Sequence, residues 1–250
     1  MSLLYRLLVS IKFLIIGALV GAAAVVVMCL LPARSDYYGD DDRVELEGTP
    51  TTYKTYKMLY VGVMTAQSLL QTRAVAINQT WGQYASRLDF YIAEDALSNH
   101  TTAELPLVWL PDVPDGYPPL KKFFRMLQYI TDHYIDEYSW FMRADDDSYV
   151  RVPELVEFLS LLDPSEPLYI GSPGTGRKED LNTLGMYTHE LYCLGGPGTV
   201  FSRALMKQLR PYLEECLGEA TTYHDDAEVG KCISRNIGIQ CTASIQVFLR

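Results

Sequence analysis

Short apolar runs alternate with segments of helical periodicity along most of the chain after Lys57. The runs are rich in β-branched and aromatic residues and are bounded by polar or Gly/Pro-containing stretches, as buried strands are. Between them, apolar residues recur every three or four positions, which predicts helices. Strands that alternate with helices indicate an α/β fold with a mainly parallel central sheet. The predicted strands cover 58–65, 88–93, 105–110, 139–144 and 168–171; the predicted helices cover 68–81, ended by Gly82, and 119–135, with a further helix opened by Pro153.

The second half of the chain continues this pattern with more interruptions. Residues 190–194 are strand-like, and a Gly-rich turn then leads through 199–201 to Ser202, which we expect to cap a helix. Pro211 is expected to kink or split that helix, because proline removes a backbone donor and clashes with the preceding turn. Asp225 and Asp226 stand where another helix begins. The predicted loops are 112–119 and 171–185.

Phe13 to Leu31 forms an apolar segment of 19 residues without a charge, close to the ~20 that a helix needs to cross the hydrocarbon layer. Arg6 and Lys12 precede it and acidic residues follow, so the positive-inside rule places the N-terminus in the cytosol. A cleaved signal peptide would have a shorter apolar core and a clearer cleavage site, so we expect a retained signal anchor. The expected organisation is a cytoplasmic tail at 1–12, a transmembrane helix at 13–31, a luminal stem at 32–56 and one folded domain at 57–250.

Composition supports a folded domain and argues against one class of partner. Hydrophobic residues make up 48% of the chain and aromatic residues 12%, which is enough for a core. Beyond residue 34 there are 18 basic and 31 acidic residues, a formal charge of −13. This excess of negative charge argues against nucleic acid as a partner, although a local basic groove could still bind a polyanionic substrate.

Cysteine and asparagine patterns both point to a secretory compartment. Four cysteines lie beyond the apolar segment, lack the CxxC spacing of zinc sites, and fit two disulfides with three possible pairings. Asn78 and Asn99 stand in N-x-T sequons, which are permissive for glycosylation in a secretory lumen. The four cysteines are Cys193, Cys216, Cys232 and Cys241.

Asp145, Asp146 and Asp147 form an acidic triplet at the end of the predicted strand 139–144. Clustered carboxylates repel one another and lose solvation beside a buried strand, so the triplet suggests a cation. The triplet at 40–42 has no apolar strand before it and is interpreted as a solvated acidic run. A bound Mg²⁺ or Mn²⁺ would also hold a diphosphate. The alternatives are a Ca²⁺ site, an acidic surface turn and an acid pair for glycoside hydrolysis.

Two further motifs allow either a structural or a chemical role. The segment Gly195-Gly196-Pro197-Gly198 lets the backbone approach a ligand closely, yet a tight strand-to-helix turn is an equal alternative. Asp225 and Asp226 at a helix start fit ordinary capping and a favourable helix dipole. In a pocket, one of the two would instead serve as the general base for an attacking hydroxyl.

Together these motifs carry a family resemblance. From about Lys57 to Cys241 the chain resembles the Fringe-like family of β1,3-glycosyltransferases, and within it is most similar to the N-terminal catalytic domain of chondroitin sulfate synthases. An Asp triplet alone would not be sufficient, but five matches occur in the family's order. They are Thr72–Val75 with Thr80–Trp81, Tyr117–Pro119 with Lys121–Lys122, Trp140–Asp147, Cys193–Gly198, and His224–Gly230.

The resemblance implies a GT-A fold, a UDP-sugar donor and a divalent metal, Mn²⁺. It also implies a disulfide between Cys216 and Cys232. The site residues that it implies are Asp147 and Asp145 for the metal; Arg73, Lys122, Asp145, Asp146, Gly195 and Gly196 for the donor; and Asp226, with Asp225 as second choice, for the general base.

For this subfamily the implied function is that of an inverting hexosyltransferase of chondroitin sulfate synthesis, anchored in the Golgi membrane with its domain in the lumen. It would transfer glucuronate from UDP-glucuronate, β1,3, to N-acetylgalactosamine. Members of the family have a histidine metal ligand that lies beyond the position where this chain stops. Chondroitin synthases also have a second domain beyond that position. We therefore expect the domain at 57–250 to be C-terminally truncated. The alternatives are a catalytically weak, membrane-anchored partner of an active chondroitin synthase, which the missing histidine favours, and a secreted sugar-binding module.

Overall fold

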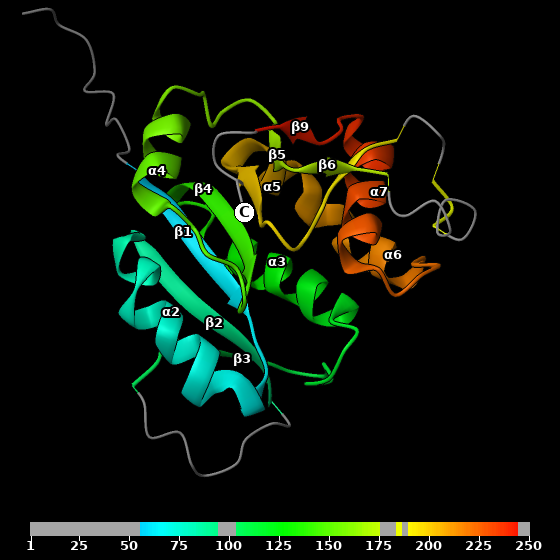
Figure 1. Ribbon diagram of the computed structural model, residues 1–250. Coiled ribbons are helices and arrows are strands. Elements are labelled where there is room, and N and C mark those ends of the chain that lie inside the picture. The colour runs from blue at the N-terminus through cyan, green and yellow to red at the C-terminus, as the bar shows by residue number, and fades with distance from the viewer. Residues whose placement is uncertain (1–55, 95–103, 176–183, 187–189, 245–250) are drawn as a thin grey trace, which may run out of the picture. The chain divides into compact units, whose positions relative to one another are not determined.

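A seven-stranded mixed sheet lies at the centre of the domain (Figure 1). The computed structural model describes residues 56–94, 104–175, 184–186 and 190–244, all within the compact unit Tyr53–Arg250. The strand order is β3-β2-β1-β4-β8-β5-β9, and β6 and β7 form a separate two-stranded sheet. The bounds are β1 Lys57–Met64, β2 Arg87–Ala93, β3 Leu107–Leu110, β4 Tyr138–Asp145, β5 Tyr169–Gly171, β6 Pro173–Gly174, β7 Tyr192–Cys193, β8 Thr199–Ser202 and β9 Thr242–Ala243.

The predicted α/β class and mainly parallel sheet are confirmed. β3, β2, β1 and β4 run parallel to one another, β8 is antiparallel to both of its neighbours, and β5 pairs with β9 in parallel. β1 and β4 are buried along nearly their whole length, as expected for strands covered on both faces. The carboxyl ends of β1 and β4 therefore meet at one edge, with Met64 in register with Asp145.

The segment predicted as one helix over 68–81 is more irregular than its periodicity suggests. It begins as a 3₁₀ turn at Gln67–Leu69, widens to a π-helical turn at Leu70–Ala74, and becomes the α-helix α2 only at Val75–Gln79. Gly82 does not end it, because a further 3₁₀ turn spans Trp81–Tyr84. The apolar period was correct, but it does not distinguish the three helix types.

The other predicted helices are present close to their expected positions. Ser202 caps α5 by accepting a hydrogen bond from the Leu205 amide at 3.1 Å. Pro211 lies in a 3₁₀ turn, Arg210–Tyr212, that separates α5 from α6, so the predicted split is confirmed. The helix bounds are α3 Leu120–Tyr134, α4 Val152–Ser160, α5 Arg203–Leu209, α6 Leu213–Gly218 and α7 Asp225–Ile237.

Two expectations for the region around the Gly-rich turn need correction. The strand predicted over 190–194 shortens to β7, which pairs with β6 outside the main sheet. The turn beginning at Gly195 leads into β8, not directly into a helix, so the strand-to-helix interpretation was wrong. The physical reason is that 199–202 pairs with β4 and β5 on its two sides, and a sequence pattern does not reveal that pairing.

In the part of the chain that the structure describes, no helix is long and apolar enough to cross a membrane. The predicted tail at 1–12, the predicted span at 13–31 and almost all of the predicted stem at 32–56 lie outside the described residues, and so does Asn99.

Candidate functional site

The acidic triplet occupies the end of β4 and the turn that follows it. Asp145 is the last residue of the strand, and the Ser148 amide closes the turn by donating to the Asp145 carbonyl at 3.1 Å. The parallel register places Thr65, which follows the end of β1, next to the triplet. The predicted location at the carboxyl edge of the sheet, where α/β folds bind ligands, is therefore what the structure shows.

The three aspartates have different surroundings. Asp146 points inward: its side chain is 8% exposed, and it accepts hydrogen bonds from Thr65 Oγ1 at 2.8 Å and from Arg73 Nη1 at 2.7 Å. The Asp147 side chain is 63% exposed and lies 3.6 Å from the same Arg73 nitrogen. The Asp145 side chain is 32% exposed. Asp145 and Asp147 thus remain accessible, while Asp146 fixes the turn.

Arg143 connects Asp145 to the second acidic motif. Its side chain is only 3% exposed, and Nη2 lies 2.8 Å from an Asp145 oxygen and 3.0 Å from Asp225 Oδ2. Arg143 and Asp225 are 82 positions apart in the sequence. The Phe123 ring lies under the guanidinium, with its centroid 5.1 Å from Cζ. One buried cation therefore brings the end of β4 and the start of α7 together.

Charge and burial both shape the ionisation of these carboxyls. Burial raises the pKa of Asp145; Arg143 opposes this rise, while Asp225 and Asp147 add to it. Burial likewise raises the pKa of Asp225, with Arg143 opposing and the neighbouring Asp226 adding. More negative charge gathers here than Arg143 alone compensates, which is the situation that a bound cation relieves.

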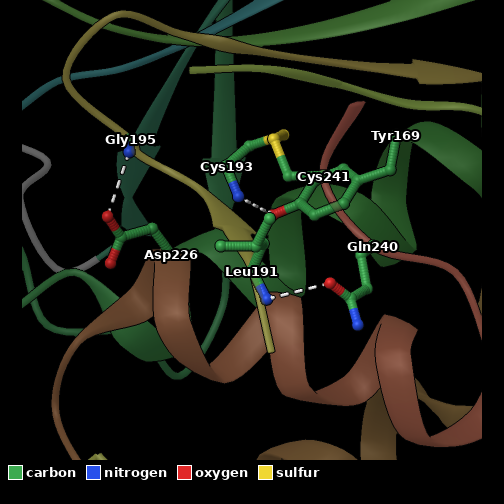
Figure 2. Close-up of a disulfide and its surroundings, with 7 residues drawn as sticks. All are labelled: Tyr169, Leu191, Cys193, Gly195, Asp226, Gln240 and Cys241. Atoms are coloured by element: carbon green, nitrogen blue, oxygen red, sulfur yellow. Dashed lines mark hydrogen bonds between the residues drawn. A yellow bond between two sulfur atoms is a disulfide. The ribbon is translucent and has the colours of Figure 1, made fainter. Parts of the chain in front are cut away.

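Asp226 is held by backbone amides, as Figure 2 shows for one of them. Its Oδ2 accepts from the Gly195 amide at 3.0 Å and its Oδ1 from the Ala227 amide at 2.8 Å. The Gly195 turn itself is closed by a hydrogen bond from the Gly198 amide to the Gly195 carbonyl at 2.8 Å. The predicted base and the Gly-rich motif therefore contact each other directly.

A hollow of about 160 Å³ lies beside Asp145 and Asp146. Its lining includes Lys122, which is almost fully buried and donates to the Thr65 carbonyl at 2.7 Å and to Asp115 at 3.2 Å. Tyr117, 83% exposed, stands at the same hollow. One aromatic ring, one lysine and the carboxylates of Asp115, Asp145 and Asp146 line this hollow, so it offers polar groups that could orient a bound ligand.

The donor set fits a divalent cation of the Mg²⁺ or Mn²⁺ kind. Among the described residues, no three His, Cys, Asp or Glu side chains are grouped as a complete metal cage. These cations are commonly bound by one or two carboxylates, with substrate phosphates and water completing the octahedron. Asp145, which lines the hollow and is paired with Arg143, and the exposed Asp147 two residues later supply two carboxylates. Asp146 is turned inward toward Thr65 and Arg73.

The remaining predicted residues are near the site or support it. The Gly196 carbonyl accepts from Ser148 Oγ at 2.8 Å, so the Gly-rich turn also contacts the segment after the triplet. The structure pairs Cys216 with Cys232, the pairing that the resemblance implied. The second disulfide joins Cys193 to Cys241 (Figure 2), and Cys193 lies two residues before Gly195. Asn78 lies on α2, partly exposed.

Arg143, Thr65 and Asp115 received no role from sequence reasoning. A charged residue inside the strand-like run 139–144 was a usable signal for Arg143, because an arginine between buried apolar residues requires a partner. Thr65 and Asp115 carried no such signal. Their roles depend on the register of β1 with β4 and on the course of the loop before α3.

Comparison with known proteins identifies relatives of the whole domain. The family described as Fringe-like matches residues 54–248. Chondroitin sulfate synthase 3 from Mus musculus is 46% identical over 193 residues, covering 76% of this chain and 22% of the relative. Chondroitin sulfate glucuronyltransferase from Homo sapiens is 28% identical over 220 residues, covering 86% of this chain and 27% of the relative. The chain thus spans about a quarter of the length of these curated relatives.

A solved structure of the galactosyltransferase LgtC, in complex with donor and acceptor sugar analogs, is also similar. It gives a TM-score of 0.46 at 11% identity and covers 73% of each chain. A likeness of this size does not by itself establish a shared fold.

Proposed function

Because this chain belongs to the Fringe-like family, we propose that its domain at 57–250 is a GT-A glycosyltransferase that uses a UDP-sugar donor and a divalent metal, Mn²⁺. In finer detail, the proposed reaction transfers glucuronate from UDP-glucuronate, β1,3, to a chain ending in N-acetylgalactosamine. The names of two relatives, chondroitin sulfate synthase 3 and chondroitin sulfate glucuronyltransferase, support this choice of donor and acceptor.

The observation that carries the proposal is the meeting of the two acidic motifs. Arg143 contacts both Asp145, at the end of β4, and Asp225, at the start of α7. A group-transfer enzyme needs a donor site and an acceptor base side by side, because holding both reactants in place supplies much of the rate enhancement. An acidic surface turn would not require a partner carboxylate from a helix so far along the chain.

On the donor side, Asp145 and Asp147 would hold the metal, and the hollow lined by Lys122 and Tyr117 would hold the nucleotide. A divalent metal held there would neutralise charge on the diphosphate and so make UDP a better leaving group. Arg73 keeps Asp146 turned inward and approaches Asp147 at 3.6 Å, which positions the turn and lowers its net negative charge.

On the acceptor side, Asp226 would be the general base. The amides of Gly195 and Ala227 each donate to one of its two oxygens and so fix its orientation, while a carboxylate oxygen can accept more than one hydrogen bond. Asp226 takes the proton of the acceptor 3-hydroxyl as that oxygen attacks the anomeric carbon. The bond to UDP breaks on the opposite face, so the configuration at the anomeric carbon inverts.

The test is release of UDP from UDP-glucuronate in the presence of a chondroitin oligosaccharide ending in N-acetylgalactosamine. Wild type should turn over with Mn²⁺ and lose turnover on chelation, and Asp147→Ala should lose at least ~100-fold in kcat/KM. Asp136→Ala is the matched control, because its side chain is also 63% exposed but pairs with Lys207 away from the site. Equal turnover with and without divalent metal would contradict the proposed role of the triplet.

Two other outcomes would redirect the proposal. Binding of Mn²⁺ and UDP without turnover would favour the catalytically weak partner of an active chondroitin synthase. Turnover with a different UDP-sugar would keep the chemistry and change the donor.

The proposal also places the protein in the Golgi membrane, with a single span at 13–31 and the domain in the lumen. The uncharged run of 19 residues, the two disulfides and the sequons at Asn78 and Asn99 support this location. Digestion by peptide N-glycosidase F of protein from membrane fractions, comparing wild type with Asn78→Gln and Asn99→Gln, tests it. Secretion of the full chain into the medium would instead favour a sugar-binding module without an anchor.

A further inference from the structure

Arg143 is a buried cation in the interior of β4. Its side chain is 3% exposed, and its Nε is buried with no hydrogen-bond partner among the described residues. Removing a guanidinium from water is costly unless opposite charges compensate it. Asp145 and Asp225 supply that compensation, so the placement of this arginine depends on both carboxylates.

The contacts of Arg143 are arranged so that a single atom serves both motifs. Nη2 lies 2.8 Å from Asp145 Oδ1 and 3.0 Å from Asp225 Oδ2, and Nη1 donates to the other Asp145 oxygen at 3.1 Å. Two carboxylates that share one nitrogen are held at a nearly fixed separation. The bidentate contact also fixes the plane of the Asp145 carboxyl group, as guanidinium–carboxylate pairs do.

Gly195 leaves room for the Arg143 guanidinium because it has no Cβ. A Cβ at this position would lie 2.7 Å from Arg143 Nη1, closer than real Cβ contacts come, and a tight 3.3 Å from Cζ, so the guanidinium would have to move. Thr199 of β8 is in register with Arg143, which places the preceding turn against the guanidinium. The same glycine donates its amide to Asp226. The missing Cβ of Gly195 therefore makes room for Arg143, the partner of Asp225, while the Gly195 amide binds Asp226.

We propose that Arg143 is a positioning residue for sugar transfer, which holds the donor-side Asp145 and the acceptor-side Asp225 at a set distance and requires Gly195 for the space it occupies. The inference rests on the proposed function, because donor side and acceptor side are defined by it. Arg143 itself would touch neither substrate; it acts through the two carboxylates.

The first experiment measures this coupling without any ligand. Asp145→Asn and Asp225→Asn are compared by thermal unfolding of the full chain, in the wild-type background and with Arg143→Met. With Arg143 present, each change leaves a buried cation less compensated, and we expect Tm to fall by about 2–4 °C. With Arg143→Met, each change removes like-charge repulsion, and we expect Tm to rise. A change in Tm of the same sign in both backgrounds would overturn the proposed coupling between Arg143 and the two carboxylates.

Two further variants cover the case in which Arg143→Met does not fold. Arg143→Lys keeps the charge but cannot form the bidentate contact. Gly195→Ala keeps Arg143 but displaces its guanidinium. In either background the fall in Tm caused by Asp225→Asn should shrink, and an unchanged fall would overturn the inference.

The second experiment separates positioning from a purely structural role. Arg143→Lys and Gly195→Ala should each lower kcat at least ~10-fold, and by a larger factor than they raise the dissociation constant for Mn²⁺ with UDP, because small misplacements affect turnover more than binding. Arg210→Lys and Gly218→Ala are matched controls: Arg210 pairs with Asp132 away from the site, and a Cβ at Gly218 meets no atom within 4 Å. Wild-type kcat in Arg143→Lys would overturn the positioning role. Failure of wild type to bind Mn²⁺ and UDP would instead overturn the proposed function, and the unfolding experiment would still decide the coupling.

Discussion

The amide of Gly195 donates a hydrogen bond to Asp226 Oδ2 at 3.0 Å, and this contact joins the Gly-rich turn before β8 to the first turn of α7. The two segments are 31 positions apart. A backbone amide directed at one carboxylate oxygen fixes the orientation of the carboxyl group, and a general base must be held within reach of the hydroxyl whose proton it takes. The contact therefore gives the Gly-rich motif a specific task in the proposed reaction.

Asp226→Asn tests that task directly. The amide oxygen of asparagine can still accept from Gly195, but the Ala227 amide loses its acceptor and the side chain can no longer take a proton. We expect kcat to fall by ~10²–10⁴-fold with little change in Mn²⁺–UDP binding, while the free energy of unfolding falls by only about 1 kcal/mol. Asp225→Asn is the companion variant. If it abolishes turnover while Asp226→Asn remains active, Asp225 is the base and Asp226 a support for the turn.

Lys122→Met removes a buried cation from the hollow beside Asp145. The change leaves the Thr65 carbonyl and Asp115 without the donor that now lies 2.7 Å and 3.2 Å away. We expect a loss of about 1–3 kcal/mol in the free energy of unfolding, measured in urea, and weaker UDP binding. Lys207→Met is the control. It breaks an exposed ion pair with Asp136 and should cost less than about 1 kcal/mol. Equal losses of unfolding free energy in Lys122→Met and Lys207→Met would show that the buried contacts of Lys122 contribute no more stability than an exposed ion pair.

The disulfide between Cys193 and Cys241 should contribute more stability than the one between Cys216 and Cys232. The first closes a sequence separation of 48 residues and the second of 16. Chain-entropy arguments give about 4 and about 3 kcal/mol for loops of these lengths. Replacing each pair by serines and measuring urea unfolding under non-reducing conditions checks the order. Because Cys193 is close to Gly195, only the first replacement should also lower turnover per folded molecule.

The ion pair between Asp132 and Arg210 predicts a specific dependence of stability on pH. Hydrogen bonds from Arg210, at 2.6 and 2.7 Å, hold the pKa of Asp132 below its ordinary value of 3.8. A carboxyl with a lowered pKa in the folded state contributes stability above its unfolded pKa and loses it as the pH falls through the folded pKa. The Tm advantage of wild type over Asp132→Asn should therefore be full at pH 7, begin to fall near pH ~4, and be lost only when the pH is below the lowered pKa of folded Asp132.

The size and control of this effect also follow from the structure. Both side chains are more than one third exposed, so the advantage should be small and should decrease with added salt. Arg210→Met should remove the same pH dependence as Asp132→Asn. An advantage that stays constant from pH 7 to pH 3 would show that the pair contributes through packing and not through charge.

Local pattern was sufficient to predict most elements of the domain. The apolar runs identified β1, β2 and β4. The helical spacing of apolar residues identified α3 with an error of one residue at each end, and Pro153 marked the start of α4 with an error of one residue. Ser202 and Pro211 predicted a cap and a break because their chemistry acts within a few residues of the same chain. The irregular helix before α2 was not predicted, since 3₁₀, π and α turns share nearly the same apolar period.

By itself, the sequence also determined that Asp145 to Asp147 end a buried strand and that Asp225 and Asp226 begin a helix, because both facts depend on local order along the chain. Only the tertiary structure decided how these motifs meet. The register of β1, β4 and β8 sets Thr65, Asp146 and Arg143 beside their partners, and Gly195 fits because another strand has brought an arginine against it. Contacts between residues so far apart depend on the packing of the whole domain, which no local pattern of polar and apolar residues contains.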